Sequence, residues 1–206
     1  MEQTDKVYLY GASGHAKVVL DIVKQAYYDV PCLIDDNPED NLLAGLPVVH
    51  SAEGLSPIIV TIGNCQKRRE IVNILGIREY LTVIHPKAVL AESVKLGCGT
   101  VVMAGAIINP YSIIGNHCII NTGASIDHDC VIHDFVHIAP HCTLCGEVEV
   151  GEGSWIGAGS TVIQGIHIGK NCYIGAGSVV LKDIPDGYLA YGNPANVIRK
   201  IDPDGK

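Results

Sequence analysis

Residues 88–183 read AVLAES VKLGCG TVVMAG AIINPY SIIGNH CIINTG ASIDHD CVIHDF VHIAPH CTLCGE VEVGEG SWIGAG STVIQG IHIGKN CYIGAG SVVLKD when divided every six residues. The third position is Ile, Leu or Val in all sixteen hexads, and the first is always Ala, Val, Thr, Ser, Cys or Ile. If positions one to three form a short strand, positions one and three face inward and position two faces outward. Positions four to six, often with Gly, then turn a corner. Three such sides, one hexad each, close a triangular coil, so the pattern predicts a stack of parallel coils.

This pattern resembles the hexapeptide-repeat, left-handed parallel β-helix, a known exception to the right-handed crossover rule. The resemblance implies a triangular column over nearly half of the chain. Four cysteines occupy the first position of a hexad and are expected to be small, buried wall residues: Cys118, Cys130, Cys142 and Cys172. The stretch CTLC (residues 142–145) is a lone CxxC, and a zinc site usually needs a second pair.

The residues before the hexads follow a different rule. KVYLYGASGHAKVVLDIVKQA reads as a strand, a Gly-rich turn and an amphipathic helix, and PIIVTIGNCQKRREIVNILG repeats that order. VPCLIDDN reads as a further strand that ends in acids. Alternating strands and helices predict a small Rossmann-like α/β domain. The expected fold class is therefore an α/β domain over residues 1–84, followed by an all-β left-handed parallel β-helix with a C-terminal tail over residues 85–206.

Composition limits the classes of function. The chain is 48% hydrophobic and 17% charged, and its formal net charge of −8 argues against nucleic acid bound through a broad basic face. No apolar run reaches the roughly 18 residues needed to cross a bilayer. The first residues, MEQTDKVYLYG, show no secretory signal, so a cytoplasmic protein without membrane contact is expected.

Three segments of the α/β domain point to a ligand. GASGH (residues 11–15) lies between a strand and a helix, where backbone N–H groups can bind a pyrophosphate, although it lacks the third glycine of a dinucleotide fingerprint. Asp35 and Asp36 follow the second strand and could hold a ribose or base. IGN (residues 62–64) follows another strand at what should be the same edge of the sheet, where open α/β sheets bind ligands. An ordinary tight turn is the alternative for GASGH.

The stretch ASIDHDCVIHDFVHIAP (residues 124–140) contains three histidines. His128 occupies hexad position five, His133 position four and His137 position two, so none is forced into the interior of the coil. Gly146 lies three hexads after His128, at the same corner one coil on. A histidine base and a glycine N–H about 5 Å apart suit acyl transfer, because one group takes a proton and the other stabilises an oxyanion.

A second corner is nearly free of side chains. Ala158 and Ala176 are also three hexads apart, and each lies inside a GAG turn. Such exposed backbone is expected to line a long, thin ligand such as pantetheine, which indicates acetyl-CoA.

Taken together, these motifs and the terminal GNPANVIRKI resemble the bacterial sugar acetyltransferases related to PglD and NeuD. Those proteins join a nucleotide-sugar domain to a left-handed β-helix and work as trimers with the active site between subunits. The resemblance implies that His128 is the general base, that Asp129 raises its basicity, and that His137 and Gly146 meet acetyl-CoA near its thioester. It also implies a UDP-sugar site made of these residues: Ser13, Gly14, His15, Asp35, Asp36, Gly63, Asn64 and, near the sugar, Asn121.

The expected activity is acetyl transfer from acetyl-CoA to the amine of a UDP-4-amino-4,6-dideoxy sugar, without a metal or a covalent intermediate. Three alternatives stay open. An O-acetyltransferase of sialic acid or another sugar would need the same base. A γ-carbonic-anhydrase-like protein would bind zinc through His128 and His133, although its third histidine, well upstream, has only His117 to match it here. A non-catalytic scaffold would leave His128 as a surface residue.

Overall fold

The α/β region is a five-stranded sheet in the order β3-β4-β2-β1-β5. A computed structural model describes residues 5–37, 39, 41–76 and 78–201. Strand β1 pairs in parallel with β2 and with β5. The elements of this region are β1 (Tyr8–Tyr10), α1 (Gly14–Gln25), β2 (Leu33–Ile34), β3 (Leu42–Leu43), β4 (Leu46–Val49), β5 (Ile58–Val60) and α2 (Cys65–Leu75). The antiparallel pair β3–β4 extends the sheet beyond what the sequence patterns predict.

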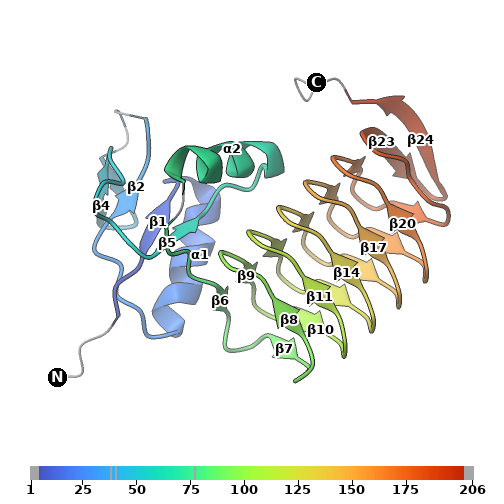
Figure 1. Ribbon diagram of the computed structural model, residues 1–206, viewed down its shortest axis with the longest axis horizontal. Helices are drawn as coiled ribbons and strands as arrows, with labels where there is room; N and C mark the ends of the chain where they lie inside the picture. Colours follow the sequence, from blue (N-terminus) through green and yellow to red (C-terminus); the bar gives the residue numbers. More distant parts are fainter. Residues whose placement is uncertain (1–4, 38, 40, 77, 202–206) are drawn as a thin grey trace.

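The two helices cover opposite faces of this sheet. Helix α1 buries Ala16, Val19, Leu20 and Val23, a spacing that puts one apolar stripe against the sheet. Its hydrophobic cluster contains Leu9, whereas the cluster of α2 contains the next residue of β1, Tyr10. Because successive side chains of a strand point to opposite faces, α1 and α2 lie on opposite sides. Figure 1 shows α2 above β1 and β5, and α1 beside them next to the first coils.

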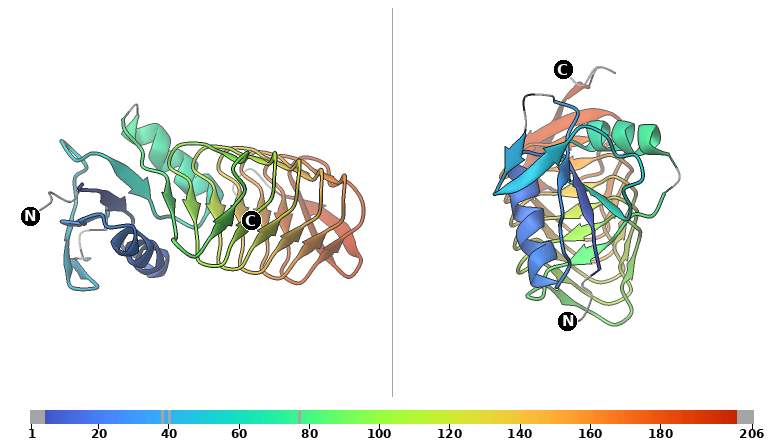
Figure 2. Two further views of the ribbon diagram at one scale, coloured as in Figure 1. Left: turned by 90° about the horizontal axis from the view of Figure 1, so that it is seen from below. Right: turned by 90° about the vertical axis from the view of Figure 1, so that its left-hand side faces the viewer.

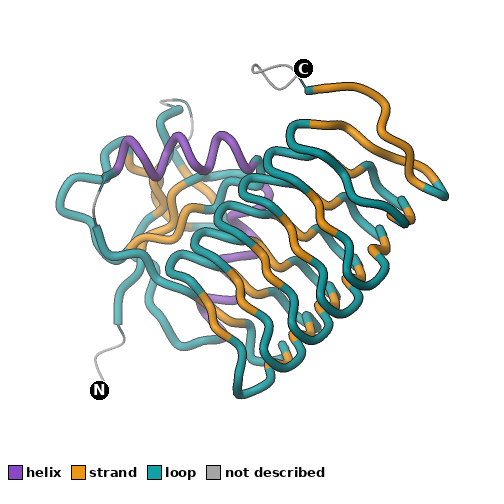
Figure 3. Tube along the Cα trace, turned by 45° about the vertical axis from the view of Figure 1, so that its right-hand side comes forward, coloured by secondary structure: helices purple, strands orange, loops and turns teal. Residues whose placement is uncertain are grey.

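The hexads form a β-helix with three parallel faces, seen as regular coils in Figure 1 and as rows of short strands in Figure 3. Each strand covers only positions two and three of its hexad. We name each face after its first strand. The β7 face contains β7 (Val89–Leu90), β10 (Ile107–Ile108), β13 (Ser125–Ile126), β16 (Thr143–Leu144), β19 (Thr161–Val162) and β22 (Val179–Val180). The β8 face contains β8 (Lys95–Leu96), β11 (Ile113–Ile114), β14 (Val131–Ile132), β17 (Glu149–Val150) and β20 (His167–Ile168).

The third face, the β6 face, closes the coils and carries the C-terminal hairpin. It contains β6 (Val83–Ile84), β9 (Val101–Val102), β12 (Ile119–Ile120), β15 (His137–Ile138), β18 (Trp155–Ile156), β21 (Tyr173–Ile174), β23 (Tyr188–Gly192) and β24 (Ala195–Lys200). Strand β6 precedes the domain boundary expected after residue 84, yet it pairs with β9. The boundary stays a proposal, and this pairing favours placing it between Tyr80 and Val83.

The interior follows the hexad rule. From Val102 to Val180, every third-position side chain is at most 1% exposed. Hydroxyls and thiols at position one are buried, and most donate to a carbonyl two and a half hexads later, as Ser112 Oγ does to Asp127 O (2.6 Å) and Cys118 Sγ to His133 O (3.0 Å). The expected wall role of the cysteines is confirmed, and all eight cysteines are free. Serine and cysteine therefore donate to equivalent carbonyls at this position.

The α/β region packs against the first coils of the β6 face. The cluster that contains α1 continues into Val101, Met103 and Ile119 of the β-helix, so one apolar core joins the two parts. The end-on view of Figure 2 shows the small sheet and α1 in front of the coils. No helix within the described ranges is long and apolar enough to cross a membrane. The expected fold class, an α/β region followed by a β-helix of hexapeptide coils, is confirmed.

Candidate active site

The turn after β1 is shaped to leave backbone donors free. Gly11 has a φ of +113°, and a Cβ there would lie 2.7 Å from Cδ1 of Ile62, so only glycine fits between the two ligand loops. Ser13 is the N-cap of α1 but makes no side-chain capping bond. Its hydroxyl and the first N–H groups of α1, from Gly14 and His15, thus suit an anion.

The two acids after β2 have different roles. The carboxylate of Asp35 accepts from Ala12 N (2.7 Å) and from Asn37 N (3.0 Å), one bond on each oxygen, so it braces the turn. Asp36 accepts one bond, from the hydroxyl of Tyr10 at 2.6 Å, and burial together with this carboxylate raises the pKa of Tyr10. Among the described residues, the second carboxylate oxygen of Asp36 has no hydrogen-bond partner. Sequence reasoning treated the two acids alike, and the contact with Tyr10 was missed.

The loop of residues 62–64 lies beside the turn at residues 11–15. Thr61 Oγ1 is 2.9 Å from both Tyr10 O and Gly11 O, which ties β5 to the first turn. Asn64 is the N-cap of α2 and accepts from Lys67 N at 2.8 Å, so its carbonyl oxygen is used structurally. The predicted convergence of the three ligand segments at one sheet edge therefore occurs.

His137 joins this edge to the β-helix. Its Nδ1 lies 3.0 Å from Gly63 O and its Nε2 lies 3.0 Å from Asn121 Nδ2. The ring is outside the coil, as its hexad position requires, but it is only 5% exposed because the α/β region covers it. Burial lowers the pKa of His137 to about 3, and the charge of Arg68 acts in the same direction. His137 is thus neutral near pH 7 and suits hydrogen bonding better than proton transfer.

His15 approaches the same ring. Its centroid lies 6.3 Å from that of His137, and its Nε2 is buried without a hydrogen-bond partner among the described residues. Burial, followed by the charge of Arg68, lowers the pKa of His15 to about 4. A buried ring nitrogen without a partner is costly, so this atom is suited to a ligand's polar group.

His128 has the opposite environment. It lies at the corner after β13, with 54% of its side chain exposed, and its Nδ1 is 2.8 Å from Asp129 Oδ2. This hydrogen bond raises the pKa of His128, because the carboxylate stabilises the imidazolium. Asp127 Oδ1 accepts from His128 N and from Asn109 Nδ2, both at 2.8 Å, which fixes the turn. An oriented imidazole with a free Nε2 is the arrangement of a general base.

Gly146 lies directly against this imidazole. A Cβ at residue 146 would lie 2.6 Å from Nε2 of His128, so any side chain would displace the ring. The N–H of Gly146 donates no hydrogen bond within the part of the chain that the structure describes. The predicted stacking of Gly146 one coil beyond His128 is therefore present, and the roles of base and N–H donor stay a prediction.

These groups occupy two different corners of the β-helix. His128, Asp129 and Gly146 belong to the turns that follow the β7-face strands, which we call the His128 corner. The turns that follow the β6-face strands form the Asn121 corner. It holds Asn121, Ala158 and Ala176, and the α/β region and His137 lie next to it on the β6 face. One chain brings together the residues within each corner but keeps the two sets on opposite sides of the β7 face.

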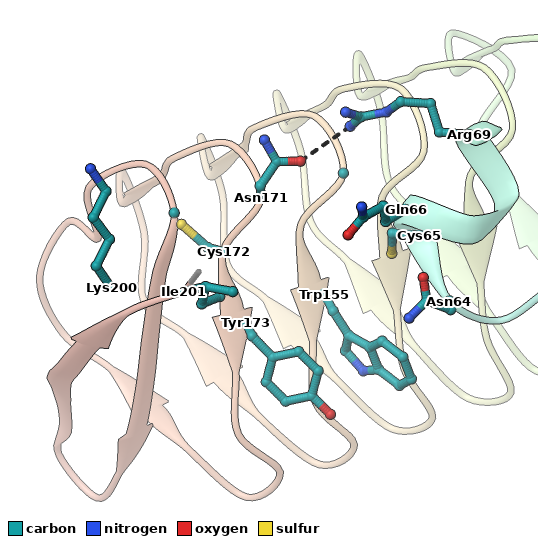
Figure 4. Close-up of a pocket in the computed structure, with 12 residues that line it drawn as sticks. Asn64, Cys65, Gln66, Arg69, Trp155, Asn171, Cys172, Tyr173, Lys200 and Ile201 are labelled. Atoms are coloured by element: carbon teal, nitrogen blue, oxygen red, sulfur yellow. Dashed lines mark hydrogen bonds between the residues drawn. The ribbon is translucent and has the colours of Figure 1, made fainter. Parts of the chain in front are cut away.

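A cavity of about 670 Å³ continues along the β6 face beyond His137 (Figure 4). The ring of Trp155 stacks on that of His137, with 4.8 Å between the ring centroids. The centroid of Tyr173 lies 5.3 Å beyond that of Trp155, so an aromatic row leads away from the candidate site. The N-terminal half of α2 forms the opposite wall, where Arg69 donates to Asn171 Oδ1 at 3.3 Å. Sequence reasoning did not single out this row, although large rings at position two of every third hexad were a visible signal.

The zinc alternative has no preformed site. His128 is bonded to Asp129, whereas His133 is bonded to Glu149 at 2.7 Å. Within the described residues, no group of three or more His, Cys, Asp or Glu side chains is arranged to hold a metal ion.

Family models match both parts of the chain. Residues 6–75 match the PglD N-terminal domain, and residues 111–146 and 147–182 match the bacterial transferase hexapeptide (six repeats). Fold, repeats and corner site together define a hexapeptide-repeat acyltransferase. The chain belongs to the PglD/NeuD-like family of these enzymes, as its sequence motifs predicted.

Solved structures support this assignment over nearly the whole chain. PerB from Caulobacter crescentus, in complex with CoA and GDP-perosamine, is 38% identical with a TM-score of 0.87, and the match covers 94% of this chain and 97% of that one. The acetyltransferase domain of PglB from Neisseria gonorrhoeae, in complex with acetyl coenzyme A, is 36% identical with a TM-score of 0.87, covering 95% and 100%. Among curated proteins, GDP-perosamine N-acetyltransferase of Escherichia coli O157:H7 is 31% identical over 101 residues, which are 49% of this chain and 45% of the relative. The chain thus matches less than half the length of this curated relative.

Proposed function

We propose that this chain transfers the acetyl group of acetyl-CoA to the amine of a nucleotide-linked amino sugar, as a step of bacterial glycan biosynthesis. The observation that carries the proposal is the pair at the His128 corner: an exposed imidazole oriented by Asp129 that lies against Gly146, whose N–H has no partner among the described residues. Family membership and the substrates bound in the solved relatives agree with it.

The mechanism follows from this geometry. Nε2 of His128 removes a proton from the sugar amine as the amine attacks the thioester carbonyl. The Nδ1–H donates to Asp129, which stabilises the imidazolium that forms. The Gly146 N–H donates to the oxyanion of the tetrahedral intermediate. The intermediate then expels the CoA thiolate, which receives the proton from His128.

The α/β region is proposed to hold the nucleotide sugar. The N-terminus of α1, with Ser13, Gly14 and His15, suits the diphosphate, and the second carboxylate oxygen of Asp36 suits the ribose or base. Asp35 supports this site by holding the turn. Gly63 and Asn121 contact His137, and Asn64 follows Gly63 in the same loop; these residues are proposed to line the path from the nucleotide toward the sugar. Exposed backbone at Ala158 and Ala176 is proposed to line the pantetheine.

The active site is proposed to need two subunits of a homotrimer. Within one chain the base lies at the His128 corner, whereas the ligand loops lie beside the Asn121 corner. If three β-helices turn their β7 faces toward a common axis, the His128 corner of one subunit meets the Asn121 corner of the next. Position two of that face fits such packing, because its residues carry no charge: Val89, Ile107, Ser125, Thr143, Thr161 and Val179. The cytoplasm, where acetyl-CoA is available, is the proposed location.

Two nucleotides are candidates for the sugar substrate. A GDP-linked amino sugar is the first candidate, because solved and curated relatives are named for GDP-perosamine. The UDP-linked sugar expected from the sequence is the second. Thermal-shift measurements with GDP-, UDP- and CMP-sugars separate them, since ligand stabilisation grows with the ratio of concentration to Kd. The assay that follows must show CoA release that depends on the amino sugar. Transfer to sialic acid, or none to any amine, would overturn the proposal.

A further inference from the structure

Arg68 is an unusually placed charge. Its side chain is 1% exposed, at the junction between α2 and the β-helix. None of the ion pairs within the described ranges includes it, so its charge is balanced by dipoles and by no carboxylate. Removing a guanidinium from water without a counter-ion is costly, and an apolar side chain would fill the same space more cheaply. A specific geometric task would explain why arginine is tolerated there.

Within the described residues, five hydrogen bonds of this guanidinium go to main-chain carbonyls. Nε donates to His117 O at 2.8 Å, and Nη2 donates to Phe135 O at 2.7 Å and to Val136 O at 3.4 Å. These acceptors lie on two successive coils of the β-helix. Nη1 donates to Ile62 O at 2.7 Å and to Gly63 O at 3.0 Å. One planar group thus clamps the loop 62–64 to the β-helix.

The Gly63 carbonyl connects this clamp to the candidate active site. It is 3.0 Å from Nδ1 of His137 as well as from Arg68 Nη1. A carbonyl only accepts, so Nδ1 must carry the proton and Nε2 must be the acceptor for the Asn121 amide. The position of one carbonyl therefore sets both the orientation and the tautomer of the ring that separates the ligand loops from the Asn121 corner.

We propose that Arg68 is a positioning residue of the acetyltransferase, which through the Gly63 carbonyl holds both the loop 62–64 and the Nδ1–H tautomer of His137. The effect of Arg68 on turnover rests on the proposed function. The tautomer of His137 does not, because it exists whether or not the chain transfers acetyl groups. Arg68 touches no reacting atom in this arrangement and acts only through Gly63 and His137.

The first test is a spectroscopic measurement on the intact wild-type protein. Nitrogen-15 NMR of the histidine rings, with His137 assigned by a His137→Gln variant, should show a neutral Nδ1–H ring between about pH 5 and 8. A neutral Nε2–H ring in the wild-type protein would overturn the inference outright. This measurement needs no variant of Arg68 to fold.

The second test compares Arg68→Met with the neighbouring variant Arg69→Met. Arg69 also ties α2 to the β-helix, through Glu152 at 3.2 Å and Asn171 at 3.3 Å, but does not contact Gly63 or His137. Arg68→Met should give a mixture of His137 tautomers and raise KM for the nucleotide sugar by about tenfold or more, as expected when a buried carbonyl loses its partner. Arg69→Met should lower Tm while leaving tautomer and KM unchanged.

Arg68→Lys is the variant to use if Arg68→Met does not fold. Lysine keeps the charge but loses the planar fork, so it should give an intermediate rise in KM and a partial loss of the tautomer. A folded Arg68→Lys or Arg68→Met protein with wild-type tautomer and wild-type KM would overturn the inference. If the wild-type chain transfers no acetyl group, the proposed function fails, whereas the tautomer and the binding constant for the nucleotide sugar still test the role of Arg68.

Discussion

His128 and His137 lie half a coil apart in the same repeat, yet their surroundings give them opposite chemistry. His128 is exposed at a corner, bonded to a carboxylate, and its pKa is raised. His137 is covered by the α/β region, bonded to neutral groups, and its pKa falls to about 3. The hexad sets the direction of both side chains, but the neighbours set their protonation. Only His128 of this pair can exchange a proton near neutral pH.

The largest expected effect comes from removing the base. His128→Ala should lower kcat by about 10²–10⁴-fold, because proton transfer in the transition state is lost. Steady-state kinetics measure this, and isothermal titration should show acetyl-CoA binding nearly unchanged. His133→Ala is the matched control, since His133 is similarly exposed and also bonded to a carboxylate. A His128→Ala enzyme with more than half of the wild-type kcat would remove the distinction between the two histidines.

A methyl group at Gly146 should disturb the same corner less severely. Gly146→Ala pushes the imidazole of His128 away, and a displacement of about 1 Å can cost about 10²-fold in rate. Backbone strain is not the cause, because Gly146 is absent from the positive-φ positions and the next coil has Gln164 at the equivalent place. In a His128→Ala background, Gly146→Ala should have little further effect on kcat. If Gly146→Ala lowered kcat in the His128→Ala background as much as it does in the wild-type enzyme, Gly146 would have a role unrelated to the imidazole of His128.

Substitutions in the two ligand regions should separate the two substrates. Asp36→Ala should raise KM for the nucleotide sugar by an amount worth about 1–3 kcal/mol, because a polar group of the ligand loses its partner. KM for acetyl-CoA should be unchanged. Ala158→Leu should do the reverse, since a bulky side chain blocks the Asn121 corner. If Asp36→Ala raised only KM for acetyl-CoA, the assignment of the α/β region would be wrong.

The smallest expected effect concerns the pH profile. A base works when unprotonated, so kcat/KM should fall as pH decreases through the pKa of His128. Asp129 raises that pKa, and Asp129→Asn should therefore move the acid limb to lower pH. Asparagine also tolerates the positive φ of +57° at this position, so the turn should persist. An acid limb that moves to higher pH, or stays in place, would show that another group controls the profile.

The sequence predicted much of this arrangement for one physical reason. A period of six leaves each side chain only one orientation, so the corner of His128 and the stacking of Gly146 over it followed from counting. The α/β region was predictable in outline because strand, Gly turn and helix have separate signatures. The β3–β4 pair was not, since LLAGLPVV carries a weak pattern.

Other features of the site depend on contacts between distant segments. Asp35 and Asp36 are adjacent in sequence, and only folding showed that Asp35 braces the turn whereas one oxygen of Asp36 has no partner among the described residues. Arg68 reads as a surface residue in the charged run QKRRE, because no local pattern reports that carbonyls of the β-helix surround it.

The sequence alone determined the coil register, the corner of each polar residue and the family resemblance, since these depend on local periodicity. Tertiary structure decided which of those residues are covered, which atoms are paired and which imidazole keeps its proton affinity. The reason is that burial and hydrogen bonding arise where the α/β region docks on the β6 face, and docking brings together residues as distant as Gly63 and His137. The pKa of a side chain depends on that environment far more than on its position in the repeat.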